Sequence, residues 1–198
     1  MRDTPTSPPH QLQAILGASE RLGFDMLGDA QAGCLLETLA ASKPGGRLLE
    51  LGTGTGYCTA WLLAGMDARA QLLSIESDPA LHQIAKTQLG DDPRVSFRTE
   101  DGGRALESMT DERYDLVFAD TWPGKYTHLD LALEHIAPGG LYVVDDMLPQ
   151  RNWPNGHAEK AAWLVQTLEQ RRDFAITKLA WSSGIIIGAK LAIDDSGV

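Results

Sequence analysis

Residues 48–57 read Leu-Leu-Glu-Leu-Gly-Thr-Gly-Thr-Gly-Tyr, and this stretch decides the fold class of the chain. Residues 47–51 have the composition of a strand, and glycine then occupies every second position from 52 to 56. Glycine permits a tight turn and lets a ligand approach the peptide plane. We expect a helix to begin at Tyr57, directly after the turn. A strand, a glycine turn and a helix in this order are typical of the ligand-binding edge of a parallel α/β sheet.

Outward from this stretch, the chain alternates between predicted helices and strands. The strands are expected at 47–51, 71–75, 95–98, 116–119, 141–144, 174–179 and 184–189. The helices are expected at 12–22, 29 or 30 to 41, 57–65, 79–89, about 104–109, 128–136 and about 157–172. This alternation predicts a mostly parallel seven-stranded sheet with helices on both faces. The short link at 180–183 predicts that the last two strands form an antiparallel hairpin.

Composition limits the class of protein. The chain has 198 residues, 43% of them hydrophobic and 22% charged, and it contains no apolar run of the length that spans a bilayer. We expect a flexible tail at 1–11 and one domain at 12–198, without repeats or a linker. Cys34 and Cys58 have no metal-ligand spacing, and the N-terminus has no secretion signal, so a cytoplasmic protein with free thiols is expected. The net charge of −10 disfavours a nucleic-acid partner.

The spacing of the glycines indicates which ligand the turn would bind. Dinucleotide-binding turns have the pattern G-x-G-x-x-G, whereas this turn has E-x-G-x-G-x-G with Glu50 at its start. A carboxylate there would repel a pyrophosphate but suits a ligand with an ammonium and a sulfonium group. The alternative is that the turn is only a tight connection between a strand and a helix.

Two further carboxylates follow the next two predicted strands. Glu76 ends the strand at 71–75, and a carboxylate at that place can accept both hydroxyls of a ribose. Asp101 follows the strand at 95–98 and is placed to meet an adenine amino group. Each acid alone could be a solvated loop residue. Three acids at the ends of three successive strands favour a shared binding site.

The order Glu50, Gly52-x-Gly54-x-Gly56, Glu76, Asp101 and Asp120 resembles the class I S-adenosylmethionine-dependent methyltransferases. More narrowly, the chain resembles the metal-dependent O-methyltransferases, the group that includes the catechol and caffeoyl-CoA enzymes. The resemblance covers roughly residues 25–190 and includes segments 26–31, 120–126 and 138–146. It implies a Rossmann-like domain that binds S-adenosylmethionine through Leu27, Glu50, Gly52, Thr53, Gly54, Gly56, Cys58, Thr59, Glu76, Ser77, Asp101, Gly102, Asp120 and Trp122.

The resemblance also implies which part of the cofactor each of these residues would contact. Glu50 and the glycines would face the methionine end of the cofactor, and Glu76 its ribose. Trp122 would pack on the adenine or would be a core aromatic under its loop. Cys58 stands where many relatives have a serine that holds the cofactor carboxylate, so Thr59 or backbone amides would replace that serine.

The resemblance also implies a divalent metal, Mg²⁺ or a similar ion. Asp120, Asp145 and Asp146 follow neighbouring strands and match the positions of two aspartates and an asparagine in relatives. Mg²⁺ prefers such oxygen ligands, and it would lower the pKa of a substrate hydroxyl. The alternative is that Asp145 and Asp146 merely end a strand.

At the position of the general base, this chain departs from the pattern of the relatives. Catechol-type relatives have a lysine three residues after the first metal aspartate, where this chain has Pro123. Lys125 would take that role, or would be a surface charge on a mobile loop. Residues 146–157 are expected to form a loop over the acceptor, in which Trp153 would stack on a planar acceptor. His157 would be a base or would simply lie near a helix start.

The sequence therefore predicts an O-methyltransferase that acts on a small hydroxylated acceptor, aromatic or aliphatic, with the help of a metal. The alternatives are an RNA hydroxy-nucleoside methyltransferase and a catalytically silent protein that binds S-adenosylmethionine. A nicotinamide dehydrogenase conflicts with Glu50 and with the glycine spacing. No membrane partner is expected. The sequence does not identify the methyl acceptor, and it is compatible with either a monomer or a homodimer.

Overall fold

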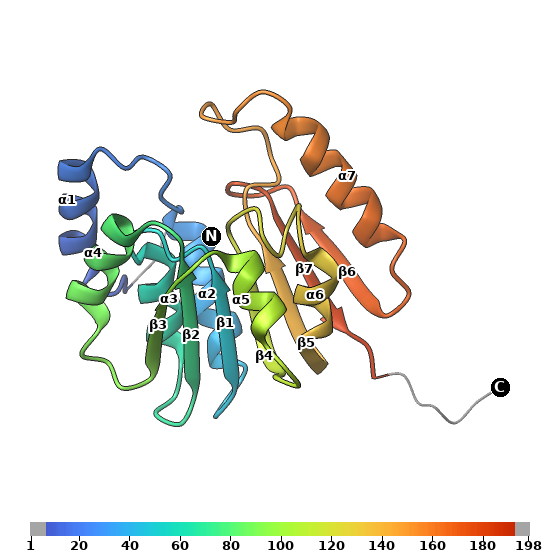
Figure 1. The fold of residues 1–198 in the computed structure, drawn as a ribbon, viewed down its shortest axis with the longest axis horizontal. Coiled ribbons are helices and arrows are strands. Elements are labelled where there is room, and N and C mark those ends of the chain that lie inside the picture. Colours follow the sequence, from blue (N-terminus) through green and yellow to red (C-terminus); the bar gives the residue numbers. More distant parts are fainter. Residues whose placement is uncertain (1–6, 193–198) are drawn as a thin grey trace.

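The computed structural model describes residues 7–192, which form a seven-stranded sheet with the strand order β3-β2-β1-β4-β5-β7-β6 (Figure 1). The first six residues, which belong to the expected tail, lie outside the described part. The strands are β1 (Arg47–Leu51), β2 (Gln71–Glu76), β3 (Val95–Thr99), β4 (Tyr114–Ala119), β5 (Ile136–Val144), β6 (Phe174–Leu179) and β7 (Ile185–Lys190).

The pairing of the strands confirms the predicted fold class. The pairs β1–β2, β1–β4, β2–β3 and β4–β5 are parallel, whereas β7 is antiparallel to both β5 and β6. Because β1, β2, β4 and β5 are parallel, their carboxyl ends meet at one edge of the sheet. The predicted site residues that follow these strands are thereby brought to the same edge.

Among the strands, β5 differs most from its expected bounds, and the others agree to within two residues. The segment Pro138-Gly139-Gly140 was expected to be a turn before a strand at 141–144, but β5 already begins at Ile136. Ile136 pairs with Tyr114, and Leu141 pairs with Leu116 after a register shift. The extra residues on β5 form a bulge, in which a Cβ on Gly140 would lie 2.9 Å from the carbonyl oxygen of Tyr114. Glycine therefore lets the bulge remain inside the strand pair.

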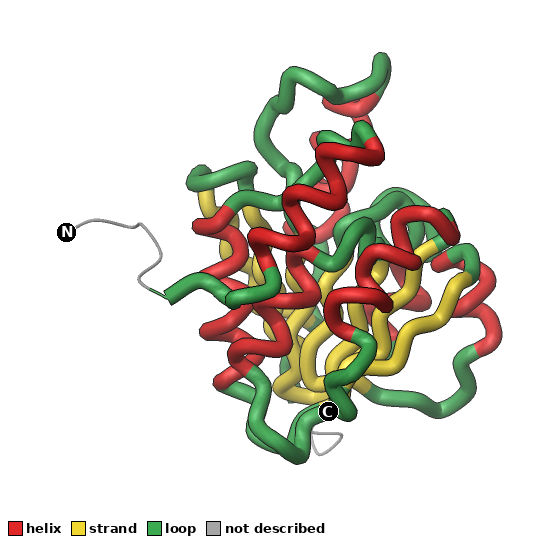
Figure 2. The backbone as a smooth tube through the Cα atoms, turned by 90° about the vertical axis from the view of Figure 1, so that its left-hand side faces the viewer, coloured by secondary structure: helices red, strands yellow, loops and turns green. Residues whose placement is uncertain are grey.

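Helices cover both faces of the sheet, as Figure 2 shows. One core cluster includes Ile15, Leu36 and Trp61, and the other includes Leu133 and Leu164. The first belongs to α1 (Leu12–Leu22), α2 (Ala30–Ala41) and α3 (Tyr57–Gly65), with α4 (Pro79–Leu89) beside them. The second belongs to α5 (Gly102–Ser108), α6 (Leu129–Glu134) and α7 (His157–Glu169).

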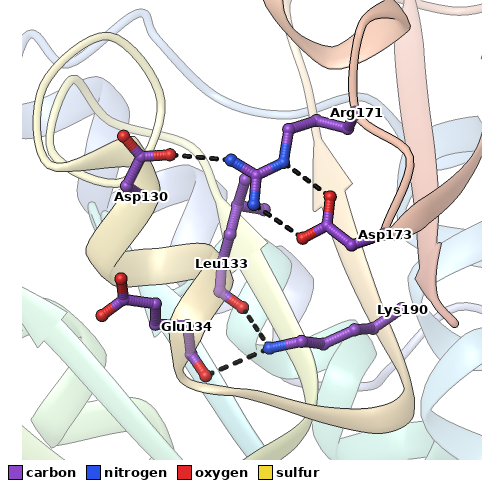
Figure 3. Close-up of polar contacts among 6 residues, drawn as sticks. All are labelled: Asp130, Leu133, Glu134, Arg171, Asp173 and Lys190. Carbon is purple, nitrogen blue, oxygen red and sulfur yellow. Dashed lines mark hydrogen bonds and ion pairs between the residues drawn. The ribbon is translucent and has the colours of Figure 1, made fainter. Parts of the chain in front are cut away.

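A polar cluster fastens the β6–β7 edge of the sheet to α6 (Figure 3). Arg171 donates two hydrogen bonds to Asp173 and one of 2.8 Å to Asp130 on α6. Lys190 Nζ donates to the carbonyl oxygens of Leu133 and Glu134 at the end of the same helix. Cations at the C-terminal carbonyls of a helix are favourable. This cluster orients the edge strands that support the β6–β7 connection.

Two segments lie along the carboxyl edge of the sheet, which is the upper edge in Figure 1. They are the chain between α1 and α2 and the long loop between β5 and α7. Both contribute to the cavity described below. Within the described range, no helix has the length and apolarity that crossing a bilayer would require.

Candidate active site

A cavity of about 530 Å³ lies at the carboxyl ends of β1, β2, β4 and β5. The glycine turn and Glu76 form one part of its wall, and the aspartates after β4 and β5 form another. The remaining wall comes from residues 24–29, the β5–α7 loop and the β6–β7 connection. The lining includes Asp25, Asp29, Gly52, Gly54, Glu76, Asp120, Lys125, Asp145, Asp146, His157, Ser182 and Ser183.

The glycine turn is held by main-chain contacts that only glycine permits. Gly52 has φ +97°, and a Cβ there would lie 2.8 Å from the carbonyl oxygen of Asp120. The amide of Gly52 donates to Ile75 O at 2.9 Å, and the amide of Gly54 donates to Glu76 Oε2 at 2.8 Å. The turn therefore fixes the Glu76 carboxylate at the cavity wall.

Glu50 lies beneath the cavity and does not line it. It is fully buried, and its Oε2 accepts hydrogen bonds from Thr59 Oγ1 at 2.6 Å and from Ser74 Oγ. Its Oε1 has no partner among the described residues. Burial raises the pKa of Glu50 to about 7, against the lowering effect of the two hydroxyls. The Thr59 hydroxyl is directed at Glu50, so it is not free to replace the serine that relatives have beside the turn.

Eight of the predicted cofactor residues line the cavity and six do not. Those in the lining are Leu27, Gly52, Thr53, Gly54, Cys58, Glu76, Asp120 and Trp122, whereas Glu50, Gly56, Thr59, Ser77, Asp101 and Gly102 lie outside it. Asp101 is exposed, and its Oδ1 accepts from the amide of Arg104, as the N-cap of α5. Gly56 has φ +94° and starts α3 against Ala85.

The three predicted metal aspartates all line the cavity. Burial raises the pKa of Asp120 well above its usual range, and the neighbouring Asp145 charge adds to this effect. Burial also raises the pKa of Asp145 to about 6, while its hydrogen bond from Ser183 opposes the rise. Asp146 has φ +60°, a conformation that aspartate tolerates better than most residues. Three carboxyl groups are thus crowded on one side of the cavity, which disfavours the ionisation of all three together.

These aspartates do not form a ready metal site. Within residues 7–192, no group of three or more histidine, cysteine, aspartate or glutamate side chains is arranged to hold a metal ion. Asp145 Oδ1 already accepts the amide of Asp146 at 2.7 Å and the hydroxyl of Ser183. The carboxylates suit a hard cation by chemistry, but their arrangement does not fit three-point ligation.

Lys125 is buried, with 3% of its surface exposed, and it lines the cavity. The interpretation of Lys125 as a surface charge is therefore wrong. Its Nζ lies 5.4 Å from the centre of the Tyr126 ring, and its charge favours the ionised forms of Asp120 and Asp145. Pro123 lies within a tight turn, in which the amides of Lys125 and Tyr126 both donate to the carbonyl of Trp122. This turn directs the lysine inward.

His157 is the first residue of α7 and also lines the cavity. Its Nε2 lies 2.9 Å from Tyr126 Oη, and its Nδ1 has no hydrogen-bond partner among the described residues. Burial lowers the pKa of His157, and the Lys125 charge lowers it further, so the ring is neutral at pH 7. Trp153 also lines the cavity, and one face of its indole stacks on the His157 ring with the two ring centres 4.3 Å apart.

Trp122 lines the cavity and is 45% exposed. The alternative that it is a core aromatic is therefore wrong. Lys160 Nζ lies 5.0 Å from the centre of its ring, and Tyr126 meets it edge-on at 6.2 Å. An exposed indole at the rim of a cavity provides a flat apolar surface for a ring.

The sequence analysis missed several lining residues. Ser182 and Ser183, in the β6–β7 connection, bond Asp29 and Asp145 respectively. Phe24 and Asp25 also line the cavity, although neither was assigned a role from the sequence. Tyr126 was quoted in a motif but received no role. No local pattern distinguishes these residues, because they meet the cavity only through the tertiary fold.

Comparison with known proteins agrees with this geometry. Residues 49–147 match the family model described as a methyltransferase domain. A protein from Mycobacterium avium (strain 104), with a provisional name as an O-methyltransferase, is 34% identical over 139 residues. That match covers 66% of this chain and 63% of the relative, so the chain spans less than two thirds of its length.

Solved structures extend the likeness across the fold. A protein from Klebsiella pneumoniae, also provisionally named as an O-methyltransferase, is 25% identical with a TM-score of 0.80. The alignment covers 95% of this chain and 92% of that one. An O-methyltransferase from Bacillus cereus, solved in complex with S-adenosylhomocysteine, is 20% identical with a TM-score of 0.82. That alignment covers 95% of this chain and 94% of the other. At 20% identity, the second likeness shows the fold alone.

Proposed function

This chain belongs to the methyltransferase-domain family, and on that basis we propose that it transfers the methyl group of S-adenosylmethionine to a hydroxyl oxygen of a small acceptor. The observation that supports the proposal most directly is the composition of the cavity at the carboxyl ends of the strands. A glycine turn with a fixed carboxylate forms one side, and a buried lysine, a histidine and aspartates form the other. Two reactants can therefore meet within one enclosure.

The glycine side suits the cofactor. The amide of Gly54 holds the Glu76 carboxylate at the cavity wall, which supports a role for Glu76 in accepting the ribose hydroxyls. Glu50, with an unpartnered buried oxygen, suits the ammonium of the methionine end, because a nearby cation would stabilise its ionised form. Trp122 offers a surface for the adenine ring. Asp101 does not line the cavity, so a contact between its side chain and the adenine would require the adenine to extend outside the cavity.

The opposite side suits the acceptor. In the transfer, the acceptor oxygen forms a bond to the methyl carbon while the carbon–sulfur bond breaks, and S-adenosylhomocysteine leaves without the sulfonium charge. The hydroxyl proton must pass to a base. We assign this role to His157, whose ring lines the cavity and whose lowered pKa favours the neutral form; its unpartnered Nδ1 is buried and would receive the proton once acceptor binding opens a path to it. The buried Lys125 would stabilise negative charge on the acceptor oxygen as it develops.

Metal assistance remains a prediction. The negative charge of Asp120, Asp145 and Asp146 supports binding of a divalent ion, which would polarise a substrate hydroxyl when bound. Against it stands the lack of a three-ligand arrangement among the residues that the structure describes. No step assigned to His157 or Lys125 above requires the ion.

A small, non-nucleic-acid acceptor fits the charge of the cavity. Six carboxylates (Asp25, Asp29, Glu76, Asp120, Asp145 and Asp146) line it, against one lysine. Such a surface repels phosphates, which disfavours the RNA alternative. The lysine and the histidine inside the cavity also favour catalysis over silent cofactor binding.

Isothermal titration tests the proposal. EDTA-treated protein is titrated with S-adenosylhomocysteine, and then, in complex, with catechol in the absence and presence of Mg²⁺. We expect cofactor binding in all conditions and catechol binding to the complex. Catechol binding only with Mg²⁺ would support a metal role, and equal binding without it would remove the metal from the proposal. No binding of S-adenosylhomocysteine, with binding of NAD instead, would overturn the proposed function.

A further inference from the structure

Two adjacent serines connect opposite walls of the cavity. Ser182 Oγ donates to Asp29 Oδ2, and Ser183 Oγ donates to Asp145 Oδ1. The two hydroxyl oxygens lie 3.5 Å apart. Asp29, both serines and Asp145 all line the cavity. The result is a continuous polar chain, Asp29–Ser182–Ser183–Asp145, which we name the serine bridge.

One end of the serine bridge is the entry segment, residues 24–29, all of which line the cavity. Asp29 is the N-cap of α2, and its Oδ1 accepts the amides of Gln31 and Ala32 at 2.8 Å each. The other oxygen, Oδ2, therefore accepts a hydrogen bond from the Ser182 hydroxyl, while Oδ1 keeps the two hydrogen bonds that cap the helix. Within this segment, Phe24 lies against Gly54 of the glycine turn, with its ring 3.4 Å from a Cβ built there. The position of the entry segment thus determines how the cavity is closed over the turn.

The other end is fixed in the sheet. Asp145, 3% exposed, directly follows β5, and the connection that bears the serines is bonded to the chain after it. The amide of Met147 donates to Gly184 O at 2.9 Å, and that of Leu148 donates to Ser183 O at 2.8 Å. A Cβ on Gly184 would lie 2.4 Å from the Leu148 nitrogen. The serines therefore stand on a rigid support.

The backbone of Ser182 is strained in a way that the bridge explains. Its φ is +59°, a left-handed conformation in which glycine would avoid the Cβ penalty. Strain that persists at a cavity wall is a reason to look for a function of the side chain. Here the hydroxyl reaches a carboxylate, and hydrogen bonds to charged groups are among the stronger ones in proteins.

We propose that Ser182 and Ser183 are positioning residues that hold the entry segment closed over the cofactor. This inference rests on the proposed function, since it concerns the binding of S-adenosylmethionine and its product. Neither serine touches the reacting atoms. They act through Asp29 and Asp145, which form the two ends of the closure.

The test measures the affinity for S-adenosylhomocysteine in paired variants. Ser182→Gly removes the hydroxyl and relieves the left-handed strain, whereas Ser182→Asn keeps a donor and tolerates that conformation. Ser183→Ala removes the second hydroxyl, and Ser183→Thr retains it. We expect Ser182→Gly and Ser183→Ala each to weaken binding about tenfold, and Asn and Thr to restore most of it. Ser42→Ala, an exposed change far from the cavity, is the control.

A merely structural role makes different predictions. Hydrogen exchange of the bound protein should show that Ser182→Gly loses protection at residues 24–29 while β1 and β4 keep theirs. Loss of protection across the whole sheet, or affinities within twofold of the unmodified chain for both hydroxyl-deleting variants, would overturn the inference. If the unmodified chain itself does not bind S-adenosylhomocysteine, the proposed function fails first. The two failures are thereby distinguished.

Discussion

Glu50 illustrates how one buried residue can set function against stability. Its pKa is about 7 in the fold and 4.5 in the reference state, because burial disfavours the charged form. The folded chain therefore keeps a proton that the unfolded chain loses as the pH rises from 4.5 to 7. The free energy of unfolding should fall across this window by about 3 kcal/mol and should stay low above it.

Glu50→Gln should remove the fall in the free energy of unfolding between pH 4.5 and 7, because the glutamine amide is neutral at every pH. Chemical denaturation from pH 4.5 to 8 should show an unfolding free energy up to about 3 kcal/mol above that of the unmodified chain at pH 8, and little difference at pH 4.5. The affinity for S-adenosylhomocysteine should fall, since the ammonium would lose its counter-charge. Glu134→Gln, an exposed change, should leave both properties unaltered. An unchanged pH profile in Glu50→Gln would show that Glu50 is ionised in the fold.

The catalytic assignment makes a second prediction at this scale. His157→Gln keeps a polar group but removes the ring nitrogen that is proposed to receive the proton. We expect kcat to fall by about 10²-fold, the range of general-base catalysis, and the dissociation constant of S-adenosylhomocysteine to stay within twofold. The rate is measured with an acceptor that the titrations identify. Tyr126→Phe, which removes only the hydroxyl bonded to Nε2, should cost less. A kcat equal to that of the unmodified chain would remove His157 from the chemistry.

Individual site residues were predictable where local sequence determines their place. The glycine turn, Glu76, Asp120 and Asp145 each follow a strand that the sequence reveals, so their common edge followed from the predicted sheet. The inward direction of Lys125 depends on the turn around Trp122, which involves main-chain bonds rather than a sequence pattern. Burial of Glu50 below the cavity depends on side chains from α3 and β2.

At the scale of elements, the packing of α2 on α3 depends on small residues. A Cβ on Gly33 would lie 2.3 Å from Trp61 Nε1, and one on Gly65 would lie 2.0 Å from Glu37 O. Trp61 is fully buried, so it has no room to move aside. Gly33 therefore lets the two helices approach closely at the largest side chain of this core.

Gly33→Ala should destabilise the chain by about 1–3 kcal/mol through overpacking, although alanine is the better helix former. The matched control is Gly17→Ala in α1, where the nearest atom to a new Cβ is the end of Arg21 at 3.5 Å. That change should stabilise the chain by about 0.5–1 kcal/mol. Urea denaturation followed by tryptophan fluorescence measures both. If the two variants were equally stable, the contact of Gly33 with Trp61 would not limit the packing.

Elements were predicted well where a hydrophobic period and its stop signals agree. The helix α2 begins at Ala30, one of its two expected starts, and α3 begins at Tyr57 as expected. The start of β5 was missed because Pro138-Gly139-Gly140 has the composition of a turn. Only pairing with β4 keeps that segment inside a strand, and such pairing depends on residues distant in the sequence.

At the scale of the whole molecule, the cavity joins segments from both ends of the chain. Residues 24–29 and 182–183 meet there, although no pattern in the sequence indicates that they are neighbours. A ligand that contacts both segments should stabilise the entire fold rather than one loop. S-adenosylhomocysteine at 100 times its dissociation constant should add about 2.7 kcal/mol to the free energy of unfolding. For a chain of this size the Tm should rise by about 5–10 °C.

Adenosine provides the control for this global prediction, because it lacks the part of the ligand that would reach Glu50 and the entry segment. At the same concentration as S-adenosylhomocysteine it should raise the Tm by a smaller amount. In the Ser182→Gly variant, the Tm increases produced by S-adenosylhomocysteine and by adenosine should differ less. The reason is that closure of the entry segment adds binding energy only when the whole ligand is bound. Equal shifts for the two ligands in the unmodified chain would mean that the methionine end adds no binding energy, and the cavity would then have to be assigned to a nucleoside. Calorimetric scans of both complexes distinguish these outcomes.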